Sequence, residues 1–343
     1  MGDPGCLFVM LVMLGLTILG AVLSEGFRFL LLGFLGFVTV LTFLILIREF
    51  LRATSWHPWQ WLRAKLGWGK SLNALAKRLD TSPQWLRDFS PSYRQHAIPK
   101  RSGGVRELHI PDAPTLEIQQ KIVRRVLYGL RSHKAATGFE KGRSIVDNAR
   151  PHVGQEVLVK LDVMDFFSST KAERIQLYFQ RVGWNREAAH LLTKLVTHDG
   201  GLPQGAPTSP RVSNLVNYLL DVRLERIATR RHGTYTRYAD DISISFPSDY
   251  PRKVRGVIQR ARRQLKALGY QLHHRKTRIL RAHQRQSVTG LNVNTKVSLP
   301  RELRRKLRAA RHRLEQGQEA TWTAEQLAGY AALEEMVRVQ AKK

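Results

Sequence analysis

Two short stretches of strand-forming residues, 234–237 and 242–246, enclose the tetrapeptide Tyr-Ala-Asp-Asp, which contains Asp240 and Asp241. This spacing predicts a β-hairpin whose turn presents two adjacent carboxylates. Another strand is predicted upstream, because apolar and polar residues alternate up to Asp162, which places its carboxylate on the side away from the valines. A sheet that joins these strands would gather three carboxylates at one edge, and hard divalent cations select such oxygen ligands.

Two uncharged apolar runs of 18 and 19 residues, 6–23 and 29–47, stand near the start of the chain. As helices they would each span roughly 27 to 29 Å, close to the hydrocarbon thickness of a bilayer. We therefore predict a transmembrane hairpin in contact with membrane lipid. A cleaved signal peptide is the alternative for the first run, but no basic residues precede it. Basic residues follow the second run, so the positive-inside rule predicts an inner-membrane protein with both termini and the remaining chain in the cytoplasm.

The charged residues lie almost entirely after these runs. The chain has 56 Lys and Arg against 27 Asp and Glu, a net charge of +29, and only three of these charged residues precede residue 48. Such an excess predicts a polyanionic partner, and nucleic acid is favoured over the alternative of anionic lipid because the acidic motifs lie within the basic region. The single cysteine, Cys6, excludes an intrachain disulfide and a cysteine metal cluster.

Three motifs occur in the order found in reverse transcriptases, and the chain resembles this family from about residue 70 onward. Residues 161–167 resemble motif A, residues 201–210 (Gly-Leu-Pro-Gln-Gly-Ala-Pro-Thr-Ser-Pro) resemble motif B, and residues 238–241 resemble motif C. Two weaker signatures resemble the retron type: Asn148-Ala149 with His152, an Asn-Ala-x-x-His pattern, and Val288-Thr289-Gly290.

The resemblance implies roles for residues around the carboxylates. Asp162, Asp240 and Asp241 are expected to hold two Mg²⁺ ions, with Asp241 as the weakest ligand. Lys276 matches the lysine that can protonate the departing pyrophosphate, and a solvated lysine is the alternative. The substrate-binding residues implied are Lys100, Arg106, Asp165, Phe166, Phe167, Gln204 and Gly205. Among them Phe167 stands where the family places a steric gate against the ribose 2′-hydroxyl, with an ordinary core phenylalanine as the alternative.

The resemblance to retron enzymes also implies contacts with RNA. Asn148 and His152 are interpreted as RNA-contacting or loop-ordering residues. In the C-terminal region, an apolar stripe flanked by arginines predicts a helix that follows a phosphate backbone, and a solvated basic helix is the alternative. The RNA-binding residues expected there are Val288, Thr289, Gly290, Arg301, Arg304 and Arg305.

We therefore expect an α/β right-hand polymerase with a ferredoxin-like α+β palm, fingers and a helical thumb, preceded by two transmembrane helices. The expected divisions are a transmembrane hairpin (1–50), a basic, Trp-rich linker with N-terminal helices (51–90), fingers and palm (91–282), and a thumb with the RNA-binding C-terminal region (283–343).

The function implied is RNA-directed DNA synthesis from dNTPs. If the chain is of the retron type, a structured noncoding RNA serves as template and primer, and the product is a branched RNA–DNA hybrid used in antiphage defence. Two alternatives are a non-retron, defence-associated reverse transcriptase and a membrane-acting effector with a polymerase-like RNA sensor. Self-association and a separately encoded effector stay open as further partnerships.

Overall fold

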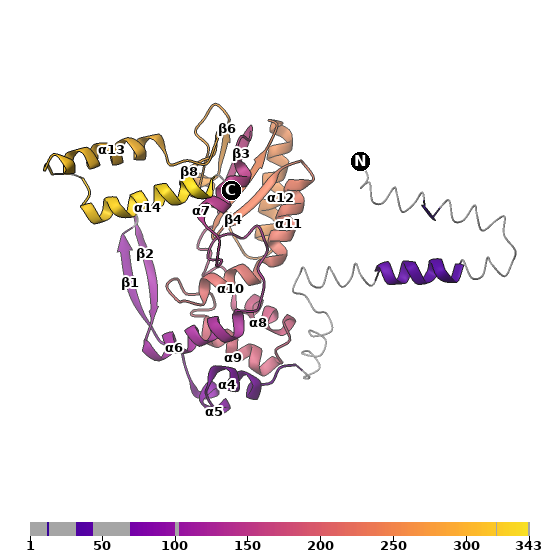
Figure 1. The fold of residues 1–343 in the computed structure, drawn as a ribbon. Coiled ribbons are helices and arrows are strands. Elements are labelled where there is room, and N and C mark those ends of the chain that lie inside the picture. Colours follow the sequence, from indigo (N-terminus) through magenta and orange to yellow (C-terminus); the bar gives the residue numbers. More distant parts are fainter. Residues whose placement is uncertain (1–11, 14–31, 44–68, 100–102, 320, 342–343) are drawn as a thin grey trace, which may run out of the picture. The chain divides into compact units, whose positions relative to one another are not determined.

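The computed structural model describes residues 12–13, 32–43, 69–99, 103–319 and 321–341 (Figure 1). The chain divides into two compact units, Met1–Trp56 and His57–Lys343.

In the first unit, residues 32–43 form a helix. Nowhere in the described residues is there a helix with both the length and the apolar character needed to cross a membrane. On this finding the predicted inner-membrane location is wrong, and the predicted contact with membrane lipid has no support in the described residues. Most of the predicted span 6–23 and both ends of the predicted span 29–47 lie outside the described residues.

The centre of the second unit is a four-stranded antiparallel sheet. Its strands are β3 (Val157–Asp162), β4 (Thr234–Tyr238), β5 (Asp241–Phe246) and β6 (Arg278–Arg281). They lie in the order β4-β5-β3-β6. With a helical connection between β3 and β4 and another between β5 and β6, this is the ferredoxin-like arrangement that the sequence predicts for the palm.

The alternation of side chains along β3 decides which face of the sheet is covered. Val157, Val159 and Leu161 are fully buried in a core with residues of helices α11 (Tyr218–Thr229) and α12 (Pro251–Lys266). Lys160 and Asp162 lie on the opposite face because successive side chains of a strand alternate. A slip of one residue in register would exchange the two sets, so burial of the valines fixes where Asp162 lies.

A second core lies under the predicted fingers and beside the palm (Figure 1). It is formed mainly by helices that begin at well-capped residues; for example, Ser71 and Ser82 each accept a hydrogen bond from the backbone N–H three residues later. These elements are α4 (Leu72–Leu79), α5 (Pro83–Asp88), α6 (Ala113–Lys121), the π-helix η1 (Ile122–Leu127), α8 (Ala172–Arg181), α9 (Arg186–Val196) and α10 (Ser209–Val216). The antiparallel hairpin of β1 (Tyr93–Pro99) and β2 (Val105–Pro111) extends from this group.

A third core joins the C-terminal helices to a short helix that lies far earlier in the chain. Its elements are α7 (Ile145–Ala149), the 3₁₀ helix η2 (Arg150–His152) that follows it, the hairpin of β7 (Ser287–Val288) and β8 (Leu291–Asn292), α13 (Arg301–Glu315) and α14 (Ala324–Gln340). A further 3₁₀ helix, η3 (His274–Lys276), contacts β3 of the palm sheet. Val146 of α7 and Leu307 of α13 share the third core, and Figure 1 shows α13 and α14 side by side. The predicted domain boundary at residue 282 stays a prediction, since side chains from both sides of it pack together here.

A fully buried ion pair joins α11 to β4. Arg237 donates from Nε and Nη2 to the two carboxylate oxygens of Asp221, each over 2.7 Å, and both side chains are 0% exposed. Tyr235 also donates to Asp221, over 2.7 Å. Burial acts to lower the pKa of Arg237, but the Asp221 carboxylate outweighs burial and the pKa is raised. Removal of either charge would therefore leave the other buried without a counter-ion.

We predict that Asp221→Asn lowers the free energy of unfolding by about 3 to 5 kcal/mol, because it leaves the Arg237 guanidinium buried without its counter-ion. Urea unfolding followed by circular dichroism measures the change. Glu117→Gln, which breaks an exposed pair with Lys121 on α6, is the matched control and should leave stability nearly unchanged. Equal effects of the two substitutions would contradict the prediction.

Candidate active site

The palm sheet brings three carboxylates to one edge. Asp162 ends β3 and lies directly opposite Asp241, which begins β5. Asp240 occupies the two-residue turn between β4 and β5, and its carbonyl oxygen accepts a hydrogen bond from the backbone N–H of Val163 over 3.0 Å. The turn and the end of β3 are therefore fixed to each other by their backbones.

Buried side chains support the backbone of this turn. Ala239 has a φ of +56°, a conformation that few residues with a side chain adopt, and its carbonyl oxygen accepts from Nη1 of the buried Arg237 over 3.1 Å. Gly138 packs against the turn so closely that a Cβ there would lie 3.0 Å from the Ala239 nitrogen. Asn214 donates to the Gly138 carbonyl oxygen over 2.7 Å and accepts from Arg237 over 3.2 Å. One buried network thus supports the backbone that carries Asp240.

Two lysines face the carboxylates from opposite sides. Lys276 Nζ lies 3.1 Å from an oxygen of Asp162, and Lys160 Nζ lies 2.9 Å from an oxygen of Asp241. Burial raises the pKa of Asp240, and the neighbouring charges of Asp162 and Asp241 raise it further. Lys276 acts to lower this pKa but does not offset the burial and the like charges. The donor set of carboxylate oxygens suits a hard divalent cation such as Mg²⁺.

Asp162 and Asp240 line a cleft of about 1400 Å³. This volume exceeds the roughly 300 to 1000 Å³ of ordinary small-molecule pockets, so the cleft has room for more than a nucleotide. The predicted substrate-binding residues that line it are Arg106, Asp165, Phe166, Phe167 and Gln204. Gly205 lies beside it, where a Cβ would approach the His109 carbonyl oxygen to 3.0 Å. Lys100 lies outside the described residues.

The two phenylalanines of motif A differ in their surroundings. Phe166 is 5% exposed, stacks on Tyr270 with ring centroids 5.6 Å apart, and lies under the Arg237 guanidinium. These contacts indicate a supporting position beneath the cleft. Phe167 is only partly buried, and its ring lies 6.3 Å from that of Phe139 across the cleft wall. Of the two, Phe167 is the ring that a bound sugar can meet.

The Asn-Ala-x-x-His residues are buried under the palm sheet. His152 is 0% exposed, with Nδ1 2.7 Å from the Ser245 hydroxyl and Nε2 2.8 Å from the Thr236 hydroxyl. Asn148 is 1% exposed and accepts a hydrogen bond from the Thr137 hydroxyl over 2.8 Å. This burial does not fit the direct RNA contact expected of the pair. It fits the alternative of ordering a loop, because η2 is fixed to β4 and β5 through His152.

The Val288-Thr289-Gly290 signature forms the turn of the β7–β8 hairpin. Thr289 and Gly290 have φ values of +47° and +81°, as a two-residue turn requires. The Thr289 hydroxyl donates to the Ile145 carbonyl oxygen at the start of α7 over 3.0 Å, and Val288 is buried against α7. Val288 therefore has no surface for RNA. The two retron signatures are distant in sequence but pack against each other in the structure.

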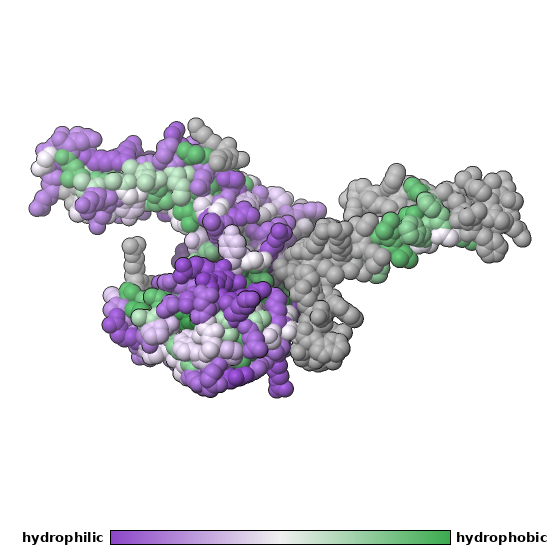
Figure 2. Space-filling model, turned by 60° about the horizontal axis from the view of Figure 1, so that its bottom comes forward, coloured by the Kyte–Doolittle hydropathy of each residue, from purple (hydrophilic) through white to green (hydrophobic). Residues whose placement is uncertain are grey.

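The arginines expected to bind RNA lie on one exposed face. Arg301, Arg304 and Arg305 of α13 are exposed, whereas Leu307 and Ala310 of the same helix are buried. Figure 2 shows hydrophilic residues along the projecting pair of α13 and α14. This distribution agrees with the predicted basic, amphipathic helix and leaves its guanidinium groups free to meet phosphates.

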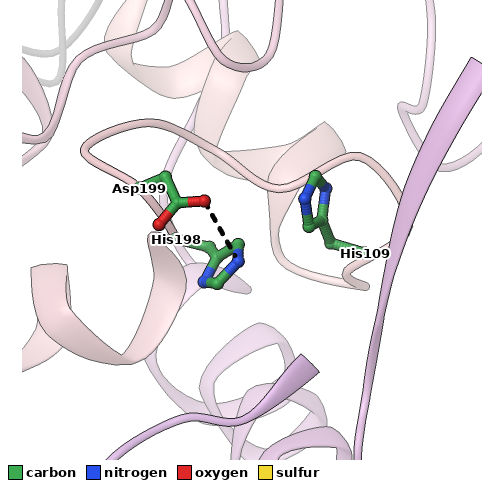
Figure 3. Close-up of side chains that lie close together, drawn as sticks. All are labelled: His109, His198 and Asp199. Atoms are coloured by element: carbon green, nitrogen blue, oxygen red, sulfur yellow. Dashed lines mark ion pairs between the residues drawn. The ribbon is translucent and has the colours of Figure 1, made fainter. Parts of the chain in front are cut away.

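Two features of the cleft were not predicted. Lys160 is the ion-pair partner of Asp241, although its position two residues before Asp162 already places both on one face of β3. His109 of β2 and the adjacent His198 and Asp199 form a second polar cluster on the cleft wall (Figure 3). No spacing pattern in the sequence relates His109 to residues about 90 positions later.

Comparison with known proteins gives consistent matches. The family model described as reverse transcriptase (RNA-dependent DNA polymerase) matches residues 98–295. The retron Mx162 and Mx65 reverse transcriptases of Myxococcus xanthus are 35% identical over 304 residues and 38% identical over 238 residues. These alignments cover 76% and 64% of this chain but only 63% and 55% of the two relatives. The retron Ec86 reverse transcriptase of Escherichia coli is 33% identical over 253 residues, which cover 71% of this chain and 78% of that protein.

We predict that His152 makes stability fall as the pH is lowered. Burial, with a smaller effect of Lys160, lowers the pKa of His152 from 6.5 to about 4. The unfolded chain therefore binds a proton between pH 6.5 and 4 that the folded chain does not, and the loss reaches about 3 kcal/mol near pH 4. Unfolding free energies measured across this range should fall less steeply in His152→Gln than in the wild type. His283→Gln, at an exposed histidine, should keep the wild-type slope; equal slopes in all three proteins would contradict the prediction.

Proposed function

This chain belongs to the retron reverse transcriptase family, and from that premise we propose that it is an RNA-directed DNA polymerase that uses dNTPs. The observation that carries the proposal is the convergence of Asp162, Asp240 and Asp241 at one edge of the palm sheet, where Asp162 and Asp240 line a cleft of about 1400 Å³. The motif B loop lines the same cleft through Gln204. The chain spans 63% and 55% of the two M. xanthus relatives, so its activity, substrates and partners are proposals.

Asp162 and Asp240 are the residues proposed to hold two Mg²⁺ ions, with Asp241 as a weaker ligand. Asp162 and Asp241 each pair with a lysine, but Asp162 and Asp240 line the cleft, which supports this order. When bound, the two ions would activate the attacking hydroxyl and neutralise the leaving pyrophosphate. The raised pKa of Asp240 favours such a role, because burial and two like charges disfavour an uncompensated carboxylate there.

The remaining cleft residues are proposed to position the nucleotide. Lys276 lies at the carboxylate edge, where its ammonium can give a proton to the departing pyrophosphate. Arg106 is exposed on β2 and lines the cleft, so its guanidinium is available to the triphosphate. Phe167 presents a partly exposed ring beside Asp165 and would exclude a 2′-hydroxyl.

We further propose that the template and primer is a structured noncoding RNA and that the product is a branched RNA–DNA hybrid with a role in antiphage defence. Similarity to several retron reverse transcriptases supports the RNA partner. The exposed arginines of α13 supply a surface for its phosphates. Sequencing of the nucleic acid that copurifies with the protein tests this point. A linear product without a 2′,5′ branch would favour a non-retron reverse transcriptase.

We predict that Asp162→Asn and Asp240→Asn each reduce primer extension on an RNA template by about a thousandfold or more, since each removes a charge worth several kcal/mol to the transition state. Asp241→Asn should cost less, because Asp162 and Asp240 are the carboxylates of this group that line the cleft. Extension assays with radiolabelled dNTPs measure the rates. Asp249→Asn, at an exposed carboxylate paired with Arg281, is the control and should retain activity. Wild-type extension by Asp240→Asn would refute the metal assignment.

We also predict that Phe167→Ala weakens discrimination against ribonucleotides by about tenfold or more, because removal of the ring makes room for the 2′-hydroxyl. The ratio of kcat/KM for dNTPs to that for rNTPs measures the effect. Phe167→Tyr keeps the ring and should keep the ratio. An unchanged ratio in the alanine variant would show that the ring serves only packing.

A further inference from the structure

The cleft holds a second set of metal-binding side chains, distinct from the three carboxylates. His109, His198 and Asp199 each offer one ligand atom within 4.8 Å of the others (Figure 3). His198 Nε2 and Asp199 Oδ2 are 3.3 Å apart. Two ligands of a tetrahedral zinc ion, with bonds of about 2.0 to 2.1 Å, also lie about 3.3 Å apart. One edge of such a site is therefore already formed, and the other two need a side-chain movement of about 1.5 Å or less.

The backbones that carry these side chains are fixed by hydrogen bonds. His198 and Gly201 exchange two backbone hydrogen bonds of 2.9 and 3.0 Å, and Asp199 and Gly200, with φ values of +48° and +73°, make the turn between them. The His109 N–H donates to the Gln204 carbonyl oxygen over 2.7 Å. The three ligands are thus attached to one stretch, 198–205, and to the strand bonded to it.

The ligand types select the class of cation. Two imidazoles and one carboxylate match the donors of three-ligand zinc sites, whereas Mg²⁺ prefers oxygen ligands alone. His109 and His198 are partly buried, and the Asp199 side chain is 81% exposed. A bound ion would therefore keep a coordination position open to the cleft, as three-ligand zinc sites do.

Ring packing is the competing explanation for the two histidines. The His198 ring lies 4.6 Å from that of Tyr93 and 4.9 Å from that of His109, measured between centroids. Packing does not account for Asp199, whose side chain lies beside the His198 nitrogen and outside this stack. Replacement of a histidine by phenylalanine separates the two explanations, because it keeps a ring and removes the nitrogens.

We propose that His109, His198 and Asp199 bind one divalent cation of the zinc type, separate from the carboxylates assigned to Mg²⁺. The ion joins β2 to the 198–201 turn and so restrains the β1–β2 hairpin against the loop that carries Gln204. This binding does not depend on the proposed polymerase activity, and it is measured without it.

The test is zinc binding by the full chain in excess Mg²⁺, which occupies oxygen-only sites. After equilibrium dialysis, elemental analysis should find one more Zn²⁺ per wild-type chain than per chain of His109→Phe or His198→Phe, with the affinity lowered by more than about a hundredfold in each variant. His96→Ala, at an exposed histidine of the same hairpin, is the matched control and should bind as the wild type does. Zinc should raise the thermal unfolding midpoint of the wild type and of His96→Ala only.

Asp199→Asn guards against misfolding of the phenylalanine variants, since its side chain is largely exposed. Co²⁺ bound to the wild type should give the visible absorption of a four- or five-coordinate site, and Asp199→Asn should weaken and shift that spectrum. Absence of stoichiometric zinc in the wild type would overturn the proposal. So would equal zinc binding in the wild type and both phenylalanine variants, or a Co²⁺ spectrum unchanged by Asp199→Asn.

Discussion

The buried pair of Arg237 and Asp221 is the interaction on which the rest of this structure depends. The guanidinium donates two hydrogen bonds to the Asp221 carboxylate and further ones to Asn214 and the Ala239 carbonyl oxygen. It thereby ties a palm helix to the backbone of the turn that carries Asp240. A buried ion pair contributes little net stability compared with apolar residues of the same size. Its value here is geometric, because a charged group with fixed hydrogen bonds defines the position of a turn that is otherwise strained at Ala239.

The active site brings three negatively charged carboxylates together, and two lysines offset their repulsion only in part. Lys276 and Lys160 pair with Asp162 and Asp241, while burial and these two carboxylates raise the pKa of Asp240. Such a site favours a cation, because a positive charge would offset the burial of Asp240 and the repulsion from its like-charged neighbours.

The sequence allowed the palm to be predicted because its signals are local. Alternation along β3 and the Tyr-Ala-Asp-Asp turn each depend on neighbouring residues, and their register follows from burial of one face. The apolar runs misled for the opposite reason, because composition indicates that a segment prefers an apolar environment and does not show which one. Among the residues that the structure describes, no helix has the length and apolar character needed to cross a bilayer. The contacts of His152 and His109 could not be predicted, because their partners lie on strands and turns that are remote in the chain. Motif resemblance indicated that residue 152 matters without showing that it is buried.

The hydrogen bond between Thr289 and Ile145 has a consequence for engineering. The hairpin that leads into the C-terminal helices is docked on a segment that lies 144 residues earlier, and both contribute to a single core. A contiguous C-terminal segment therefore cannot simply be exchanged between relatives. A chimera that imports the C-terminal helices of a relative would need to import residues 145–152 with them, or the side chains of this core would no longer match.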